Sequence, residues 1–263
     1  MCIAYLAIER DPDWPLFIAA NRDEFHARAS RPAAPWPDAA HIIAGRDSVA
    51  GGTWLGVTRQ GRYAFLTNYR DPSSVMPNAP SRGELVGNYL LRNESPASYA
   101  AAVSRVASTY NGFNLIIGDA HSCFYVGNRT NHREPRALGR GSHVLSNHLL
   151  DTPWPKARRL RRAMDDLDLR QLDTSLAPAF AALRDNARAE DADLPDTGIS
   201  LERERLLSSP FVISADYGTR CSTIVAIHAS GKALLSEISF DRDGNTTQRH
   251  DWPFTIRPDA QPA

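Results

Sequence analysis

The chain of 263 residues (29.0 kDa) contains 30 basic and 30 acidic residues, and 42% of its residues are hydrophobic. This composition excludes a disordered chain, which would have few apolar residues, and a globally basic nucleic-acid-binding protein, which would carry excess positive charge. No stretch approaches the roughly 18 apolar residues of a membrane span and the start lacks a signal-peptide pattern, so we expect a soluble, cytoplasmic protein without an integral membrane segment.

The chain begins with an apolar run over residues 2–8, and a second apolar run follows over residues 16–20. Prolines and charges separate the two runs, which predicts a turn and therefore a hairpin. The second run ends in the polar cluster Asn21-Arg22-Asp23-Glu24. If the two strands pair, Arg22 and Asp23 lie beside Cys2, where a guanidinium favours the thiolate.

Residues 27–50 are rich in Ala, Pro and Arg and show no period, which predicts a long surface loop. The glycine pair Gly51-Gly52 then leads into a strand that presents Trp54, and residues 63–67 form the next strand. That strand ends in a second polar cluster, Asn68-Tyr69-Arg70-Asp71. A buried strand that ends in polar side chains is thus predicted twice.

The rest of the chain alternates between pairs of helices and groups of strands. Ser81 and Glu84 have the spacing of a capping box at the start of the first helix, and Asp243-Gly244 is typical of a hairpin turn. We predict helices over residues 81–92, 95–108, 154–169 and 175–190, and strands over residues 113–119, 123–126, 143–146, 211–213, 222–227, 233–240 and 246–249.

This order of elements favours an α+β fold. Strands that are apolar on both faces, separated by paired helices, suggest two antiparallel sheets stacked face to face with helices outside them, which is a four-layer αββα sandwich. Periodicity alone does not distinguish this arrangement from a simpler α+β fold. We expect one domain over residues 1–255 and a tail over residues 256–263.

Cys2 is a candidate nucleophile. Once Met1 is removed, the residue carries both a thiol, which titrates near pH 8.5, and an α-amine, which titrates near pH 7.7 to 8 and can accept the thiol proton. On position alone, a small buried residue at an arbitrary chain start is the favoured interpretation, because short motifs often match by chance. Because Cys2, Cys123 and Cys221 suggest neither a disulfide framework nor a metal site, they favour a reducing compartment.

Five further polar residues complete a candidate site for acyl transfer. Such a site needs a nucleophile, a base, donors for the oxyanion and a group that orients the base. Asn147 follows a predicted strand, and Arg220 lies in a predicted turn over residues 217–220. The set consists of Cys2, Arg22, Asp23, Asn68, Asn147 and Arg220.

Several motifs together resemble the NRDE, or transport and Golgi organization, protein family over roughly residues 1–225. They are Met1-Cys2, Asn21-Arg22-Asp23-Glu24, the run from Gly51 to Gly56, Thr67-Asn68-Tyr69-Arg70, Ser81-Arg82-Gly83, Gly112-Phe113-Asn114-Leu115, Leu145-Ser146-Asn147 and Tyr217-Gly218-Thr219-Arg220. The resemblance implies a four-layer fold of the N-terminal nucleophile hydrolase type. It also implies a eukaryotic branch linked to haem trafficking, Golgi organisation and lipid metabolism.

More distantly, the chain is similar to the choloylglycine hydrolase and acid-amidase group, which cleaves C–N amide bonds. Carried over by position, Cys2 would be the nucleophile, Arg22 and Asp23 would support it, Asn68 and Asn147 would hold the oxyanion, and Arg220 would stabilise charge. In that group an asparagine and one further residue typically separate the arginine from the aspartate, whereas Arg22 and Asp23 adjoin. Asn21, Trp54, Tyr69 and Arg70 are candidate substrate-binding residues.

Two functions of different classes follow. The first is a Cys-dependent hydrolase or acyl transferase acting on a C–N amide bond of a small acylated substrate, with no cofactor. The second is a non-catalytic protein on the same fold that binds and traffics haem or a lipid-like ligand. No histidine pair has metal-ligand spacing, so no metal site is expected, and the substrate, turnover and oligomeric state stay open.

Overall fold

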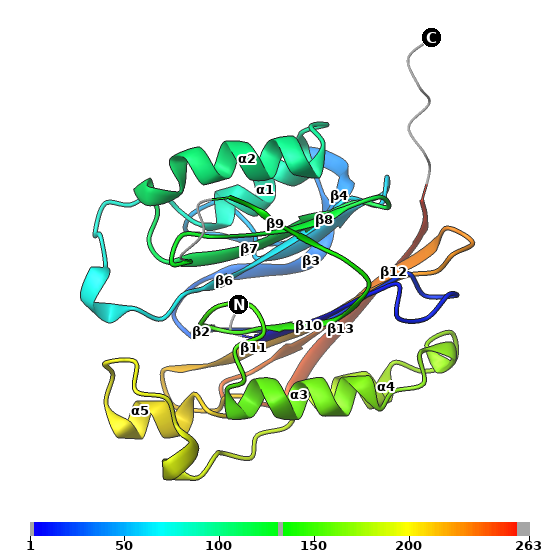
Figure 1. The fold of residues 1–263 in the computed structure, drawn as a ribbon. Coiled ribbons are helices and arrows are strands. Elements are labelled where there is room, and N and C mark those ends of the chain that lie inside the picture. The colour runs from blue at the N-terminus through cyan, green and yellow to red at the C-terminus, as the bar shows by residue number, and fades with distance from the viewer. Residues whose placement is uncertain (1–2, 131–133, 257–263) are drawn as a thin grey trace.

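The computed structural model describes residues 3–130 and 134–256. Figure 1 shows four layers, in which two sheets stack face to face and helices cover the outer face of each sheet. The four-layer α+β sandwich predicted from the sequence is therefore confirmed.

Antiparallel pairs make up both sheets. The first has six strands in the order β10-β1-β2-β11-β12-β13, and the second has seven strands in the order β3-β4-β5-β6-β7-β8-β9. The strands of the six-stranded sheet are β1 (Ile3–Ile8), β2 (Leu16–Phe25), β10 (Gly141–Leu145), β11 (Tyr217–Ile227), β12 (Lys232–Phe240) and β13 (Thr246–Thr255). Those of the seven-stranded sheet are β3 (Ser30–Trp36), β4 (Ala39–Asp47), β5 (Leu55–Thr58), β6 (Tyr63–Asn68), β7 (Phe113–Gly118), β8 (Cys123–Gly127) and β9 (Arg136–Leu138).

The helices lie outside the two sheets. Figure 1 shows α1 (Gly83–Leu91) and α2 (Pro96–Val106) over the seven-stranded sheet, and α3 (Pro155–Asp165) and α4 (Ala177–Leu183) over the six-stranded sheet. A further helix is α5 (Leu201–Leu206), and short 3₁₀ turns are η1 (Pro72–Ser74), η2 (Ala107–Thr109), η3 (Leu169–Gln171) and η4 (Asp191–Asp193). No helix within the described ranges is long and apolar enough to span a membrane.

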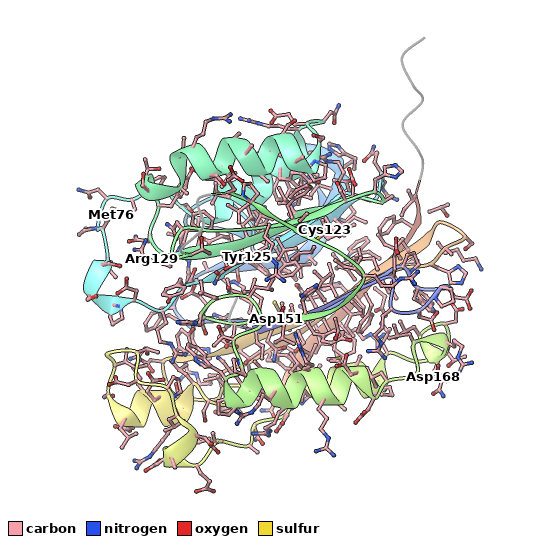
Figure 2. The ribbon with its side chains drawn as sticks, in the orientation of Figure 1. Met76, Cys123, Tyr125, Arg129, Asp151 and Asp168 are labelled. Carbon is pink, nitrogen blue, oxygen red and sulfur yellow. The ribbon has the colours of Figure 1, made fainter. Side chains whose placement is uncertain are left out.

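Alternation along the strands produces three hydrophobic cores. In β2, Leu16 and Ile18 point into the space between the sheets, whereas Phe17 and Ala19 pack beneath α3 and α4. A third core lies between the seven-stranded sheet and α1 and α2. Figure 2 shows how densely side chains fill the space between the layers. The central strands of each sheet are thus buried on both faces, which explains why these strands are apolar on both faces.

The predicted surface loop over residues 27–50 is wrong, because this segment forms β3 and β4. Strand β3 is an edge strand, where prolines and partly exposed side chains are tolerated. Its Pro and Arg residues hid the alternation, although Trp36 at its end is 3% exposed. The missing alternation of apolar and polar residues over this segment therefore reflects the edge position of β3 and not a loop.

Other element boundaries also differ from the predictions. β2 continues through the polar cluster to Phe25, β11 already begins at Tyr217 in place of the predicted turn, and residues 211–213 form no strand. Ser81 does not cap α1, which begins after Arg82, and Glu84 instead accepts a hydrogen bond from the Tyr110 hydroxyl. α4 is shorter than predicted, and α5 was not predicted. The first polar cluster thus extends β2, because Asn21 and Asp23 find buried partners, whereas β6 ends at Asn68, the first residue of the second cluster.

Candidate functional site

A cleft of about 540 Å³ opens between the two sheets beside the start of β1. We call it the polar cleft. Its walls include Arg22 and Asp23 from β2 and Asp47 and Asn68 from β4 and β6, together with Trp54. Four of the residues predicted to form the site, Arg22, Asp23, Trp54 and Asn68, are therefore brought together by the fold.

Arg22 carries a charge that is almost fully buried. Its side chain is 3% exposed, its Nη2 lies 3.8 Å from Asp47 Oδ2, and its guanidinium carbon lies 4.4 Å from the centroid of the Trp54 ring. A buried charge is tolerated only with such partners. A Cβ at Gly45 would collide with the Trp54 ring, so glycine is needed there to seat the indole. Arg22 is thus a fixed positive charge in the wall of the cleft.

Asp23 is held by the neighbouring strand. The Thr219 hydroxyl donates to Asp23 Oδ1 at 2.7 Å, and the Val212 N–H donates to the same hydroxyl at 2.9 Å. The pairing of β2 with β11 shifts between Thr219 and Cys221, and such an irregularity redirects side chains locally. Asp23, at 3% exposed, is therefore a fixed carboxylate beside Arg22.

Asn68 and Asn147 come from different sheets and meet. Asn147 Nδ2 donates to the Asn68 carbonyl at 3.0 Å, and the Thr67 hydroxyl donates to the Ser146 carbonyl at 2.5 Å. These bonds tie the segment after β10 to the end of β6. The Asn68 side-chain amide makes no hydrogen bond to another described residue, so its N–H groups are available to a ligand in the cleft.

The remaining predicted residues lie outside the lining of the polar cleft. The Asn21 amide donates to the carbonyls of Leu183 and Pro210, on the outer face of the sheet. Arg70 Nη1 lies 2.6 Å from Glu204 Oε2 in a largely buried ion pair. The Tyr69 ring lies 5.0 Å from that of His148. Asn21 and Arg70 therefore have structural partners.

Arg220 lies in β11 and donates from Nη1 to the carbonyls of Phe25 and His26 at 3.2 and 3.0 Å. Burial and the nearby positive charge of Arg22 lower the pKa of Arg220. Arg220 is thus electrostatically coupled to Arg22 although it does not line the polar cleft. Cys2, the predicted nucleophile, lies outside the described residues.

Sequence reasoning missed two buried charged residues near this site. Lys156 is 1% exposed and its Nζ lies 3.4 Å from Asn147 Oδ1. Glu237 is 1% exposed between the sheets, where it accepts hydrogen bonds from the Ala33 N–H and the Thr223 hydroxyl, and burial raises its pKa. The rarity of lysine in this chain was the one available signal for Lys156. Glu237 lies in the middle of a predicted strand, and nothing in the sequence marks it.

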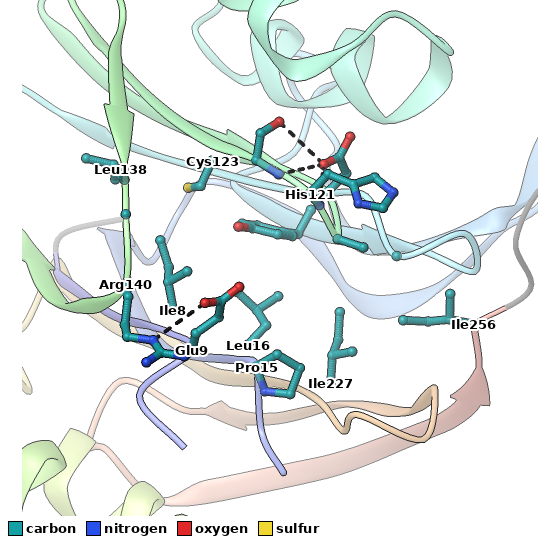
Figure 3. A pocket seen from close by; sticks show the side chains of 16 residues that line it. Ile8, Glu9, Pro15, Leu16, His121, Cys123, Leu138, Arg140, Ile227 and Ile256 are labelled. Carbon is teal, nitrogen blue, oxygen red and sulfur yellow. Dashed lines mark hydrogen bonds and ion pairs between the residues drawn. The ribbon is translucent and has the colours of Figure 1, made fainter. Parts of the chain in front are cut away.

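A second cavity, of about 260 Å³, lies between the same sheets at the far end of β1 and β2 (Figure 3). We call it the apolar pocket. Its walls include Ile8, Leu16 and Ile227 from one sheet and Tyr63 and Cys123 from the other. Burial raises the pKa of Cys123 to about 12, so its thiol stays protonated at neutral pH. An exposed ion pair between Glu9 and Arg140, at 3.5 Å, lies at its rim.

Within residues 3–130 and 134–256, no group of three or more His, Cys, Asp or Glu side chains is placed to hold a metal ion.

Comparison with known proteins decides the family. The sequence profile of Transport and Golgi organisation 2 matches residues 1–242. The chain belongs to the Transport and Golgi organisation 2 family. Among the relatives in this family, a Mus musculus homolog is 33% identical over 98% of this chain and 100% of its own length, and a Homo sapiens homolog is 34% identical with the same coverage. The family resemblance seen in the sequence motifs is thus confirmed.

Two solved structures have a similar chain path at low sequence identity. A Caenorhabditis elegans ortholog of N-acylethanolamine-hydrolyzing acid amidase has a TM-score of 0.44 at 10% identity, and covers 85% of this chain and 92% of its own. A C2A mutant of conjugated bile acid hydrolase from Clostridium perfringens has a TM-score of 0.41 at 11% identity, and covers 97% and 98%. These likenesses are too distant to bear on the site.

Proposed function

We propose that this protein is a Cys-dependent hydrolase or acyl transferase that acts on a C–N amide bond of a small acylated substrate. The observation that carries the proposal is that charged and amide side chains from both sheets converge on the start of β1. The proposed catalytic set is that predicted from the sequence, with Cys2 as nucleophile.

The strand registers support the role of Cys2. Ile3 pairs with Asn21, so the next residue of β2 beyond this pair is Arg22. On the other side, Ala4 pairs with Leu145, and the chain continues from there to Asn147. Cys2 precedes Ile3 by one peptide bond, and consecutive Cα atoms are about 3.8 Å apart. Arg22 and Asn147 are therefore the polar residues that lie just beyond the partners of β1 on either side, and the proposal assigns both to the nucleophile.

The proposed reaction uses the chain's own groups. The α-amine of Cys2 accepts the thiol proton, and the thiolate attacks the substrate's carbonyl carbon. Asn68 and Asn147 donate to the oxyanion that forms, while Asp23 orients the amine and the positive charges of Arg22 and Arg220 favour the anionic species. The C–N bond then breaks, the leaving amine takes the proton, and water or another acceptor releases the acyl group from sulfur.

The lining of the polar cleft favours a polar substrate. Arg28 and Asp47, whose side chains lie 2.7 Å apart, line it together with Arg22, Asp23 and Glu24. Charged groups that are already paired bind a ligand with its own hydrogen-bonding groups better than a bare hydrocarbon. Trp54 provides an apolar surface for the acyl part.

The proposal is tested with a panel of N-acyl amides at neutral pH. Some amide should be cleaved, and Cys2→Ala should lower kcat by at least about 10³-fold because the nucleophile is lost. Cys123→Ala is the matched control, since its thiol lies in the apolar pocket, and it should retain turnover. Intact mass should show that Met1 has been removed. A mature protein that keeps Met1 has no free amine on Cys2 and would refute this mechanism.

The second candidate function is the binding and trafficking of haem or a lipid-like ligand without turnover, and the apolar pocket favours the lipid-like ligand. Its volume of about 260 Å³ is below the roughly 300–1,000 Å³ of drug-sized ligand sites, so an aliphatic chain fits it better than a macrocycle. Haem titration followed by absorbance, beside calorimetry with a medium-chain fatty acid, tests it. Stoichiometric binding by a protein that cleaves no amide would decide for this function. A cytoplasmic location belongs to both candidates.

A further inference from the structure

Lys156 is a buried cation whose presence needs a reason. It lies in the first turn of α3, is 1% exposed, and is one of two lysines among 30 basic residues. The other, Lys232, is exposed. Burying an ammonium costs several kcal/mol unless partners compensate for the lost water.

The ammonium fixes which way the Asn147 amide points. Lys156 Nζ lies 3.4 Å from Asn147 Oδ1, and Asn147 Nδ2 donates to the Asn68 carbonyl at 3.0 Å. An ammonium only donates and a carbonyl oxygen only accepts, so the two partners allow one orientation of the amide. A flipped amide would place its NH₂ group against the ammonium and its oxygen against the Asn68 carbonyl.

We propose that Lys156 is a positioning residue that orients Asn147 as an oxyanion donor. One N–H of Asn147 Nδ2 donates to the Asn68 carbonyl, and the proposal assigns the second N–H to the substrate oxyanion. The ammonium on the opposite side also polarises the amide, and this makes its N–H a stronger donor. The inference rests on the proposed function, since it names a residue that supports the same site.

The test uses the full-length ¹⁵N-labelled protein and three variants. Asn147→Ala identifies the side-chain NH₂ signals of Asn147 by their loss. Lys156→Met removes the charge and keeps an unbranched side chain, and it should shift or broaden those signals. Lys232→Met, the matched control at the other lysine, should leave them unchanged. This readout requires no turnover.

Kinetics with the cleaved amide provide the second readout. Lys156→Met should lower kcat by about 10- to 100-fold with KM changed less than about twofold, because the donor acts on the oxyanion. The double variant with Asn147→Ala should be no slower than Asn147→Ala alone, since Lys156 acts through Asn147. Should Lys156→Met not fold, Lys156→Gln replaces it, with an expected loss of about three- to tenfold since a donor remains without the charge.

Unchanged Asn147 NMR signals in the folded Lys156 variant would overturn the inference. A kcat in the double variant that is lower than that of Asn147→Ala by the full factor seen for Lys156→Met would overturn it as well. A wild-type protein that cleaves no amide on the panel would instead refute the proposed function. In that case, shifted Asn147 signals in Lys156→Met would support only the contact that orients the Asn147 amide. The role of Lys156 in oxyanion stabilisation would be refuted together with the proposed function.

Discussion

The two ends of the space between the sheets differ in chemistry although the same strands form them. At the turn end of the β1–β2 hairpin, Ile8 and Leu16 line the apolar pocket. At the other end, β2 places Arg22 and Asp23 in the polar cleft. β6 shows the same division, with Tyr63 at one end and Asn68 at the other. In β2 and β6, one end of the strand thus contributes apolar packing, and the other end contributes the charged and amide side chains of the polar cleft.

The chemical difference between the two ends bears on the reactivity of the cysteines. Cys123 in the apolar pocket and Cys221 between the sheets are 3% and 4% exposed, and burial raises the pKa of both thiols. Both are therefore inert near neutral pH. Cys2 precedes β1 in the sequence, and under the proposed function it reacts beside a guanidinium and amides, so we expect the opposite behaviour. Side-chain surroundings, not residue type, separate a structural thiol from a reactive one.

The largest effect is expected in the polar cleft. Asn68→Ala should lower kcat by about 10²–10³-fold because one oxyanion donor is lost. The free energy of unfolding should change little, since the Asn68 amide has no hydrogen bond to another described residue. Asn93→Ala, an exposed asparagine, is the matched control. Full activity in a folded Asn68→Ala protein would remove this donor from the mechanism.

In the apolar pocket we expect a substitution to lower stability and to leave kcat nearly unchanged. Leu16→Ala should lower the free energy of unfolding by about 2–3 kcal/mol, measured by urea denaturation, because Leu16 is 5% exposed and its loss enlarges a cavity. The kcat of the folded variant should stay within about twofold of the wild type. Leu91→Ala, at a side chain that is 50% exposed, should cost less than about 0.5 kcal/mol. A large kcat loss in Leu16→Ala would show that the two ends are coupled.

A smaller effect is expected at Asp151, labelled in Figure 2, which holds the segment that carries Asn147. Its carboxylate accepts from the Val144 N–H at 2.9 Å, lies 2.8 Å from His143 Nδ1 and pairs with Arg161. Burial alone would raise the pKa of Asp151, but these partners outweigh it and hold the pKa below its usual value of 3.8.

A lowered folded-state pKa stabilises the fold above the unfolded pKa, and the contribution is lost as the pH falls through the folded value. Asp151→Asn should therefore cost about 1–2 kcal/mol at pH 7 and much less near pH 3. Urea denaturation at both pH values measures the difference between variant and wild type. A difference that stays constant across this range would mean that the charge of Asp151 does not stabilise the segment.

Much of the polar cleft could be predicted from the sequence, because its residues directly follow apolar runs. Buried runs have to pair, so polar residues just after them are brought to common edges. This is how Arg22, Asp23 and Asn68 were predicted to lie together. A shared oxyanion role for Asn68 and Asn147 was expected from the likeness to the choloylglycine hydrolase and acid-amidase group, and cross-sheet hydrogen bonds bring the two residues together.

The rest depends on contacts that no local pattern encodes. Asp47 reaches Arg22 from β4. This strand lies in the segment over residues 27–50, which was predicted to be a loop because the neighbouring edge strand β3 contains prolines. Arg70, a candidate substrate-binding residue, pairs with Glu204 from α5, a helix that was not predicted. Lys156 reaches the site from a helix outside the sheet. Such side chains are identified only once the layers are stacked.

The most direct test of the central claim compares the three cysteines in one experiment. The folded protein is exposed briefly to iodoacetamide at pH 7, and peptide mass spectrometry measures the alkylated fraction at Cys2, Cys123 and Cys221. We predict that Cys2 reacts at least about tenfold faster than the other two, and that Arg22→Ala slows it by disfavouring the thiolate. Equal rates at all three cysteines, or a Cys2 that reacts no faster than the buried Cys123, would contradict the claim that the polar cleft activates Cys2 as a nucleophile.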